Sequence, residues 1–209
     1  LACHMKSWST QRRGEYIYNI ARTRWATHVL RYAGIRLTVE GADVFAPDNY
    51  FVVTPNHTSV LDIPLVVSLV PNGRFIFKME IWRIPIINAA AFWGGQISIN
   101  RRDHTQSMTA IRRGIEEWRT CNLINFPEGT RSRKPEKLGL FKYGATAIAI
   151  EKGYPILPMS IRGAGAALKK GLHTGLKMGT PITVTFEDPI ETRSLSSEDI
   201  PRITREVRM

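Results

Sequence analysis

His57 and Asp62 are the two side chains in this sequence whose types and spacing best suit proton transfer. A neutral imidazole can accept a proton near pH 7. A carboxylate five residues further on can hold the ring in one tautomer and stabilise the imidazolium that forms. The segment 56–62 therefore predicts a general base made of two residues.

The same segment also allows a purely structural interpretation. Ser59, followed by Asp62 three positions later and by an apolar run, matches a capping box at the start of a helix. Nothing within the segment shows that a substrate reaches His57. Both interpretations stay open at this point, and other segments have to decide between them.

A second polar segment, 125–132, follows a predicted strand and turns through proline and glycine. Arg131 can bind a phosphate through two parallel hydrogen bonds, Thr130 can donate another, and the backbone at Gly129 can approach a ligand closely. This composition suits phosphate recognition at the edge of a sheet. The alternative is an ordinary surface turn in which Arg131 pairs with Glu128.

Arg101 and Arg102 follow a further predicted strand, which ends at Ile99. Neighbouring residues at a strand end point to opposite faces. We therefore predict that Arg101 contacts the same ligand, and that Arg102 is a solvated or packing charge.

Short β-rich runs alternate with helical patterns, which favours an α/β fold with helices covering a largely parallel sheet. Ligands in such sheets usually bind at the carboxyl ends of the strands. His57, Arg101 and Glu128 each follow a predicted strand, so we expect them on one rim. The strands are predicted at 36–39, 50–54, 75–77, 95–99, 122–126, 156–161 and 181–186, and the helices at 59–69, 81–92, 104–119 and 141–151.

The N-terminal segment from about 11 to 32 predicts a helix, because apolar and aromatic residues recur at helical spacing and five arginines lie among them. Such a helix can lie in a membrane interface, or it can pack on the domain with a solvated basic face. The predicted organisation is a basic amphipathic membrane-docking helix at 6–34, a catalytic domain at 35–190 and a polar C-terminal tail at 191–209, where Ser196 caps a possible last helix.

The composition of the chain, above all its net positive charge, indicates which kinds of molecule it can bind. The 209 residues include 29 Lys and Arg against 18 Asp and Glu, a formal net charge of +11, which attracts nucleic acid, anionic membranes or phosphorylated ligands. No apolar run reaches the roughly 18 to 20 residues that span a bilayer, so any membrane contact is predicted to be peripheral. The two cysteines form no framework, which indicates a reducing compartment.

Other chemistries lack their motifs in this chain. We find no His-Glu-x-x-His zinc motif, no Gly-x-Ser-x-Gly nucleophile elbow and no Gly-x-x-x-x-Gly-Lys phosphate loop. The segment 163–168 begins like a dinucleotide-binding fingerprint but lacks its third glycine, and we predict it to be a flexible loop.

Four segments in order resemble the blocks of the glycerolipid acyltransferases of the lysophosphatidate acyltransferase type, and the resemblance covers roughly 36–190. The stretch from Lys78 to Pro85 also resembles the Lys-x-Glu-Leu and Ile-Pro stretch between the first two blocks. One departure is Asn100, which stands where Asp is frequent. The four segments are Asn56-His57-Thr58-Ser59-Val60-Leu61-Asp62, Ile99-Asn100-Arg101, Phe126-Pro127-Glu128-Gly129-Thr130-Arg131-Ser132 and Tyr154-Pro155-Ile156-Leu157-Pro158-Met159-Ser160.

The resemblance implies a glycerol-phosphate-acyltransferase-like fold and transfer of a fatty acyl group to the sn-2 hydroxyl of lysophosphatidate, giving phosphatidate. The donor would be acyl-CoA or acyl-carrier protein as co-substrate, with no metal and no other cofactor. His57 would be the base, oriented by Asp62. The residues implied to bind substrate are Lys78, Arg101, Glu128, Gly129, Thr130 and Arg131.

The resemblance also favours the membrane-interface interpretation of the N-terminal helix. It implies a protein associated with an anionic membrane surface, facing the cytoplasm, and not bound to nucleic acid. The alternatives are an acyltransferase for another lysophospholipid or lipid acceptor, a basic nucleic-acid-binding domain and a catalytically idle lipid-binding module. The last two leave His57 and Asp62 without a role.

Overall fold

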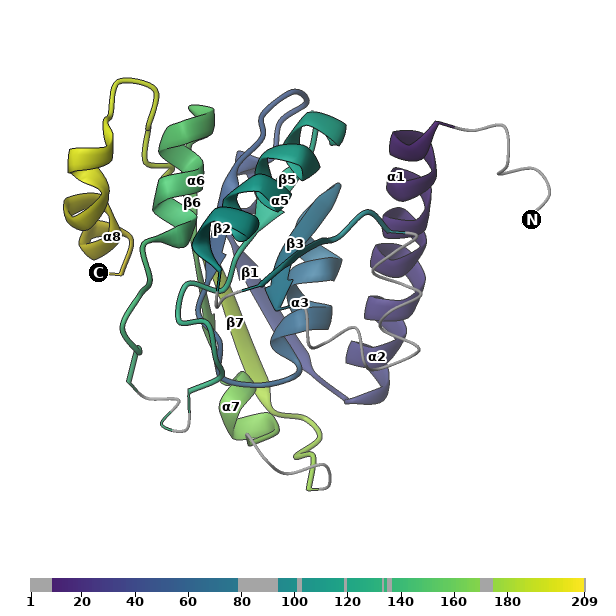
Figure 1. The fold of residues 1–209 in the computed structure, drawn as a ribbon. Helices are drawn as coiled ribbons and strands as arrows, with labels where there is room; N and C mark the ends of the chain where they lie inside the picture. Colours follow the sequence, from purple (N-terminus) through teal and green to yellow (C-terminus); the bar gives the residue numbers. More distant parts are fainter. Residues whose placement is uncertain are drawn as a thin grey trace.

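A seven-stranded sheet forms the centre of the computed structural model, with strand order β1-β7-β6-β2-β5-β3-β4 (Figure 1). The structure describes residues 9–78, 94–100, 103–118, 120–132, 134, 137–169 and 175–208. The strands are β1 (Arg36–Glu40), β2 (Val52–Pro55), β3 (Gly73–Lys78), β4 (Ile97–Ile99), β5 (Asn122–Ile124), β6 (Ile156–Arg162) and β7 (Pro181–Phe186).

Five neighbouring strands, from β6 through β2, β5 and β3 to β4, run parallel. The other two run the opposite way, because β7 pairs antiparallel with β6 and β1 pairs parallel with β7. The prediction of a largely parallel sheet is therefore confirmed. The carboxyl ends of the five parallel strands meet at one rim, where ligands bind in such sheets.

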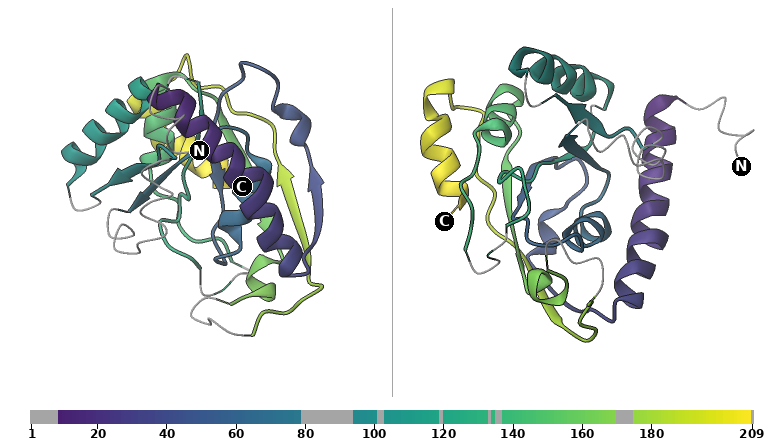
Figure 2. Two further views of the ribbon diagram at one scale, coloured as in Figure 1. Left: turned by 90° about the vertical axis from the view of Figure 1, so that its right-hand side faces the viewer. Right: turned by 60° about the horizontal axis from the view of Figure 1, so that its bottom comes forward.

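Helices cover both faces of the sheet, as the predicted fold class requires (Figures 1 and 2). Val52 and Val53 of β2 point to opposite faces, and each enters a different core. Val53 packs with α2, α3 and α7, whereas Val52 packs with α5, α6 and α8. The helices are α1 (Thr10–Ile20), α2 (Thr27–Tyr32), α3 (Asp62–Leu69), α5 (His104–Glu117), α6 (Gly144–Lys152), α7 (Ala164–Ala167) and α8 (Ile200–Arg208).

The predicted N-terminal helix is present, and it contains a π-helical segment, Ala21–Ala26, between α1 and α2. Tyr18 and Ala26, eight positions apart, are both buried. At ordinary α-helical spacing they would lie roughly 80° apart around the helix axis, and the wider π turn, with its i→i+5 bonding, brings them closer to one side. The same turn keeps Ile20 and Trp25, five positions apart, together on the exposed side.

A buried cation lies where the N-terminal helix meets the sheet. The guanidinium carbon of Arg74 in β3 lies 4.3 Å from the ring of Trp118 and 5.6 Å from the ring of Tyr18. Its Nη1 donates to the carbonyl of Gly73 at 2.8 Å. Burial lowers the pKa of Arg74 and raises the pKa of Tyr18. Aromatic faces are the partners that hold this charge away from water.

Several predicted elements differ from the observed ones. Helix α3 begins at Asp62 rather than at 59, α6 begins at Gly144 rather than at 141, and the predicted loop 163–168 contains helix α7. The predicted helix 81–92 lies outside the described residues. No helix in the described part of the chain is both long and apolar enough to cross a membrane.

The polar segment from 191 onward contains the last helix that Ser196 was predicted to cap, and this helix packs on the domain. Ser196 forms a capping box with Asp199 at the start of the 3-10 turn Ser197–Asp199, and α8 follows directly. Ile203 and Val207 of α8 are buried in the core that includes α6. Their spacing of four residues gives the helix one apolar stripe, which is why it packs on the domain.

Candidate active site

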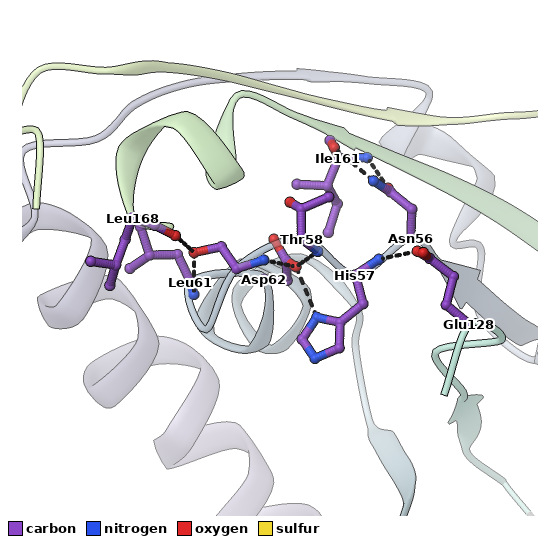
Figure 3. Close-up of polar contacts among 9 residues, drawn as sticks. Asn56, His57, Thr58, Leu61, Asp62, Glu128, Ile161 and Leu168 are labelled. Carbon is purple, nitrogen blue, oxygen red and sulfur yellow. Dashed lines mark hydrogen bonds and ion pairs between the residues drawn. The ribbon is translucent and has the colours of Figure 1, made fainter. Parts of the chain in front are cut away.

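The imidazole of His57 and the carboxylate of Asp62 are in direct contact, as the sequence predicted. His57 Nδ1 lies 2.9 Å from Asp62 Oδ2 (Figure 3). A carboxylate accepts hydrogen bonds, so this contact assigns the proton to Nδ1 and leaves Nε2 as the acceptor. Nε2 points away from Asp62, and the side chain of His57 is 14% exposed. The arrangement is that of a general base with an oriented ring.

Asp62 is fully buried, and its side chain accepts hydrogen bonds from the backbone of the preceding residues. The N–H groups of Thr58 and Ser59 donate to Asp62 Oδ2 at 2.6 and 2.8 Å. Asp62 is also the first residue of α3, where the helix dipole favours a negative charge. These donors hold a buried anion in place. Asp62 Oδ1 makes no hydrogen bond to any residue that the structure describes.

The capping interpretation of Ser59 is wrong in its main part. The residue that caps α3 is Leu61, without a side-chain hydrogen bond. Ser59 Oγ accepts from the N–H of Leu61 at 3.3 Å and donates to the carbonyl of Leu168 at 2.8 Å. Ser59 therefore ties the segment 56–62 to the residue that follows α7.

The segment 126–132 holds His57 on three sides. Glu128 Oε1 accepts from the N–H of His57 at 2.8 Å, and the N–H of Ser132 donates to the carbonyl of His57 at 2.7 Å. The ring of Phe126 stacks on the imidazole. The two most informative sequence segments are thus brought together, as predicted from their places after β2 and β5.

Glu128 is buried, and both of its oxygens are bonded to backbone. Oε1 receives the N–H of His57, and Oε2 receives the N–H of Gly139 at 3.1 Å. In the structure this carboxylate joins the loop that carries His57 to the loop that leads to α6. A contact between Glu128 and substrate stays a prediction.

The other predicted binding residues lie around the same rim where they are described. Lys78 ends β3, while Gly129, Thr130 and Arg131 lie in the turn after β5. Gly129 has a positive φ of 70°, which favours glycine. Its N–H donates to the carbonyl of Phe126 at 3.0 Å, so it is not available to an oxyanion in this conformation. Arg101 lies outside the described residues.

Asn56 and Phe126 are site residues to which sequence reasoning gave no role. Asn56 Nδ2 donates to the carbonyl of Ile161 at 3.0 Å, and the N–H of Ile161 donates to Asn56 Oδ1 at 2.6 Å. This pair of bonds fixes the start of the segment 56–62 to β6. In the sequence, only their positions could have indicated a role, because Asn56 belongs to the segment 56–62 and Phe126 to the segment 126–132.

A hollow of about 980 Å³ lies elsewhere, between the start of α1, β4 and α5. Trp118, Gln96 and Arg113 are among the residues that line it, whereas His57 and Asp62 do not. Among the described residues no group of three or more His, Cys, Asp or Glu side chains is placed to hold a metal ion.

Comparison with known proteins gives the family. A family model described as Acyltransferase matches residues 36–162, which include the sheet rim and the segments 56–62 and 126–132. The chain belongs to the acyltransferase family. The match begins at the first residue of β1 and ends at the last residue of β6, so the N-terminal helix and α8 lie outside the matched part of the chain.

Relatives and a solved structure agree with this assignment. The chloroplastic 1-acyl-sn-glycerol-3-phosphate acyltransferase of Arabidopsis thaliana is 32% identical over 168 residues, which are 79% of this chain and 46% of that protein. The Mus musculus enzyme named 1-acyl-sn-glycerol-3-phosphate acyltransferase alpha is 28% identical over 200 residues, 94% of this chain and 70% of that protein. The chain thus spans about half the length of some relatives that it matches.

The crystal structure of PlsC, the 1-acyl-sn-glycerophosphate acyltransferase of Thermotoga maritima, superposes with a TM-score of 0.72 at 28% identity. The superposition covers 93% of this chain and 76% of the other chain. The predicted fold class and the predicted family are therefore both confirmed.

Proposed function

We propose that the protein transfers a fatty acyl group from an acyl thioester to the sn-2 hydroxyl of lysophosphatidate, giving phosphatidate and a free thiol. The observation that carries the proposal is the 2.9 Å contact between His57 Nδ1 and the buried Asp62 carboxylate, which leaves Nε2 ready to accept a proton. Family membership and the names of the relatives support the reaction and the acceptor.

The reaction needs one base and no covalent intermediate between the acyl group and the protein. As the acceptor hydroxyl attacks the thioester carbonyl, His57 Nε2 takes its proton, and the imidazolium is stabilised by Asp62. The tetrahedral intermediate then collapses and the carbon–sulfur bond breaks. The proton held on Nε2 passes to the departing thiolate, which returns His57 to its neutral form.

The position of the acceptor follows from the charges on the rim. The phosphate of lysophosphatidate would bind the cations predicted there, Arg131, Lys78 and Arg101, through charge-assisted hydrogen bonds. Arg131 is half-buried beside Ser132, whose N–H donates to the carbonyl of His57. A phosphate bound at Arg131 would thus place the glycerol close to the base.

We also propose that the N-terminal helix docks on an anionic membrane surface facing the cytoplasm. Tyr16, Ile20 and Trp25 are exposed along this helix, and Arg24 is exposed beside them. Aromatic rings among arginines suit the headgroup region of a bilayer. Docking would bring the enzyme to a substrate that resides in the membrane.

The decisive experiment is thiol release by purified protein supplied with a long-chain acyl-CoA and lysophosphatidate. His57→Ala should lower the rate by roughly 10² to 10⁴, the usual contribution of a general base. A panel of lysophospholipids with other headgroups tests the acceptor, and acyl-carrier protein in place of CoA tests the donor. Equal rates for wild type and His57→Ala would overturn the mechanism.

A further inference from the structure

Two segments that are distant in the sequence expose large apolar side chains at the same end of the molecule. Tyr32, the last residue of α2, is 87% exposed, and Met178, in the loop before β7, is 69% exposed. Leu176 in the same loop is also exposed. Figure 1 shows the end of α2 and the segment leading into β7 at the lower end of the protein.

These two segments form one surface because direct contacts join them. The N–H of Gly179 donates to the carbonyl of Gly34 at 2.9 Å, and Arg36 Nε donates to the carbonyl of Gly179 at 2.8 Å. A Cβ added at Gly34 would lie 3.3 Å from Met178 Cε, so Met178 packs on the turn that follows Tyr32. We call Arg31, Tyr32, Leu176, Lys177 and Met178 the docking face.

The two sequence segments that contribute the docking face carry charge of one sign. The sequence segments 27–38 and 163–180 contain no Asp or Glu. An exposed set of aromatic, aliphatic and basic side chains matches the interfacial zone of an anionic bilayer, where apolar groups enter and basic groups meet lipid phosphates. The Lys and Arg residues of these segments are Arg31, Arg36, Lys169, Lys170 and Lys177.

Two hydrogen bonds connect the docking face to the catalytic loop. The N–H of Lys177 donates to the carbonyl of Ala167 at 2.9 Å. The next residue, Leu168, accepts the hydroxyl of Ser59, which precedes Asp62 by three positions. A membrane that contacts the loop 175–180 would thus lie beside the segment that holds His57.

We propose that the docking face binds the surface of an anionic lipid bilayer, and that it does so together with the N-terminal helix. The inference rests on the proposed function, because it explains how the rim that carries His57 meets a lipid acceptor in its membrane. It adds a second contact, from the loop 175–180, that the helix alone does not provide.

The test compares two variants with the same change in charge. Lys177→Glu combined with Met178→Ser alters the docking face, and Arg205→Glu alters the exposed surface of α8, which lies on the opposite side of the molecule from α2 (Figures 1 and 2). Binding is measured by co-sedimentation with vesicles of phosphatidylcholine and phosphatidylglycerol. The first variant should bind at least about tenfold more weakly than wild type, and Arg205→Glu less than about threefold. Equal binding by the two variants would overturn the proposal.

A second measurement separates docking from catalysis. With a short-chain lysophosphatidate dispersed as monomers, the Lys177→Glu, Met178→Ser variant should release thiol at the wild-type rate, and only the rate on vesicle-embedded substrate should fall. If wild type releases no thiol with any acceptor while the vesicle result stands, the proposed function fails and the docking face remains. If the variant loses rate equally on both substrates, the loop acts on catalysis itself and the docking proposal fails.

Discussion

The imidazole ring of His57 stacks on the phenyl ring of Phe126, with 4.1 Å between the ring centroids and 23° between the planes. Phe126 in turn stacks with Phe75 of β3 at 6.2 Å. The ring of His57 is thus held by an aromatic face on one side and by the carboxylate of Asp62 at Nδ1. Core packing, and not only the Asp62 contact, sets the direction of Nε2.

Asp62→Asn should show how much the negative charge of Asp62 contributes to kcat. The amide oxygen can keep the three hydrogen bonds of Oδ2, while the NH2 group takes the place of Oδ1, which has no hydrogen-bond partner in the described part of the chain. The imidazolium then loses its counter-charge, and we expect kcat to fall by roughly 10² to 10⁴. Steady-state thiol release gives the rate, and circular dichroism checks the fold. A kcat within threefold of wild type would exclude Asp62 from catalysis.

Glu128→Gln should reveal whether this carboxylate positions the base. A glutamine can accept only one of the two N–H groups, from His57 and Gly139, that Glu128 accepts. We expect a loss of about 1 to 3 kcal/mol in the free energy of unfolding. We also expect a lower kcat with little change in KM for lysophosphatidate.

Glu151→Gln is the matched control for that substitution. Glu151 forms a surface ion pair with Arg112 at 2.6 Å, and such pairs contribute about 0 to 1 kcal/mol. Its activity should equal that of wild type. A raised KM with unchanged kcat in Glu128→Gln would instead assign Glu128 to substrate binding.

The N-terminal helix should lose its affinity for anionic membranes when its exposed side is changed. Arg24→Glu together with Trp25→Ala removes a basic and an aromatic side chain that face solvent, so the fold should be spared. Binding to anionic vesicles should weaken at least about tenfold and melting temperature should stay the same. Vesicle binding equal to that of wild type would show that this helix packs on the domain and does not bind the membrane.

The stability of the protein should depend on pH through Cys121. Burial raises the pKa of this thiol from about 9 to about 12, and the nearby Arg74 opposes part of that rise. Above pH 9 the unfolded chain loses the proton while the folded chain keeps it, so this thiol makes stability fall by about 1.4 kcal/mol per pH unit towards pH 12.

Cys121→Ala provides the comparison, because it lacks the thiol and shares every other ionisable group. The difference in unfolding free energy between wild type and variant, measured by urea titration, should shrink as pH rises from 9 to 10.5. A difference that stays constant over this range would show that Cys121 does not titrate differently on folding.

Local sequence patterns predicted the parallel strands and the His57–Asp62 pair because alternation and motif spacing depend on nearby residues. The role of Ser59 could not be predicted, since its hydroxyl bonds to Leu168 far along the chain. The stack of Phe126 on His57 is likewise a tertiary contact. The last helix was predicted from its cap at Ser196, and its packing on the domain follows from Ile203 and Val207, which are spaced for one face of a helix.

The central place of β2 links catalysis to the stability of the whole sheet. This strand has three neighbours on each side, and its residues are buried along its length. Its amide hydrogens should therefore exchange with solvent only when the domain opens globally, whereas fraying at β1 or β4 leaves them protected. His57 follows the end of this strand by two residues, so loss of activity on heating would coincide with global unfolding rather than precede it.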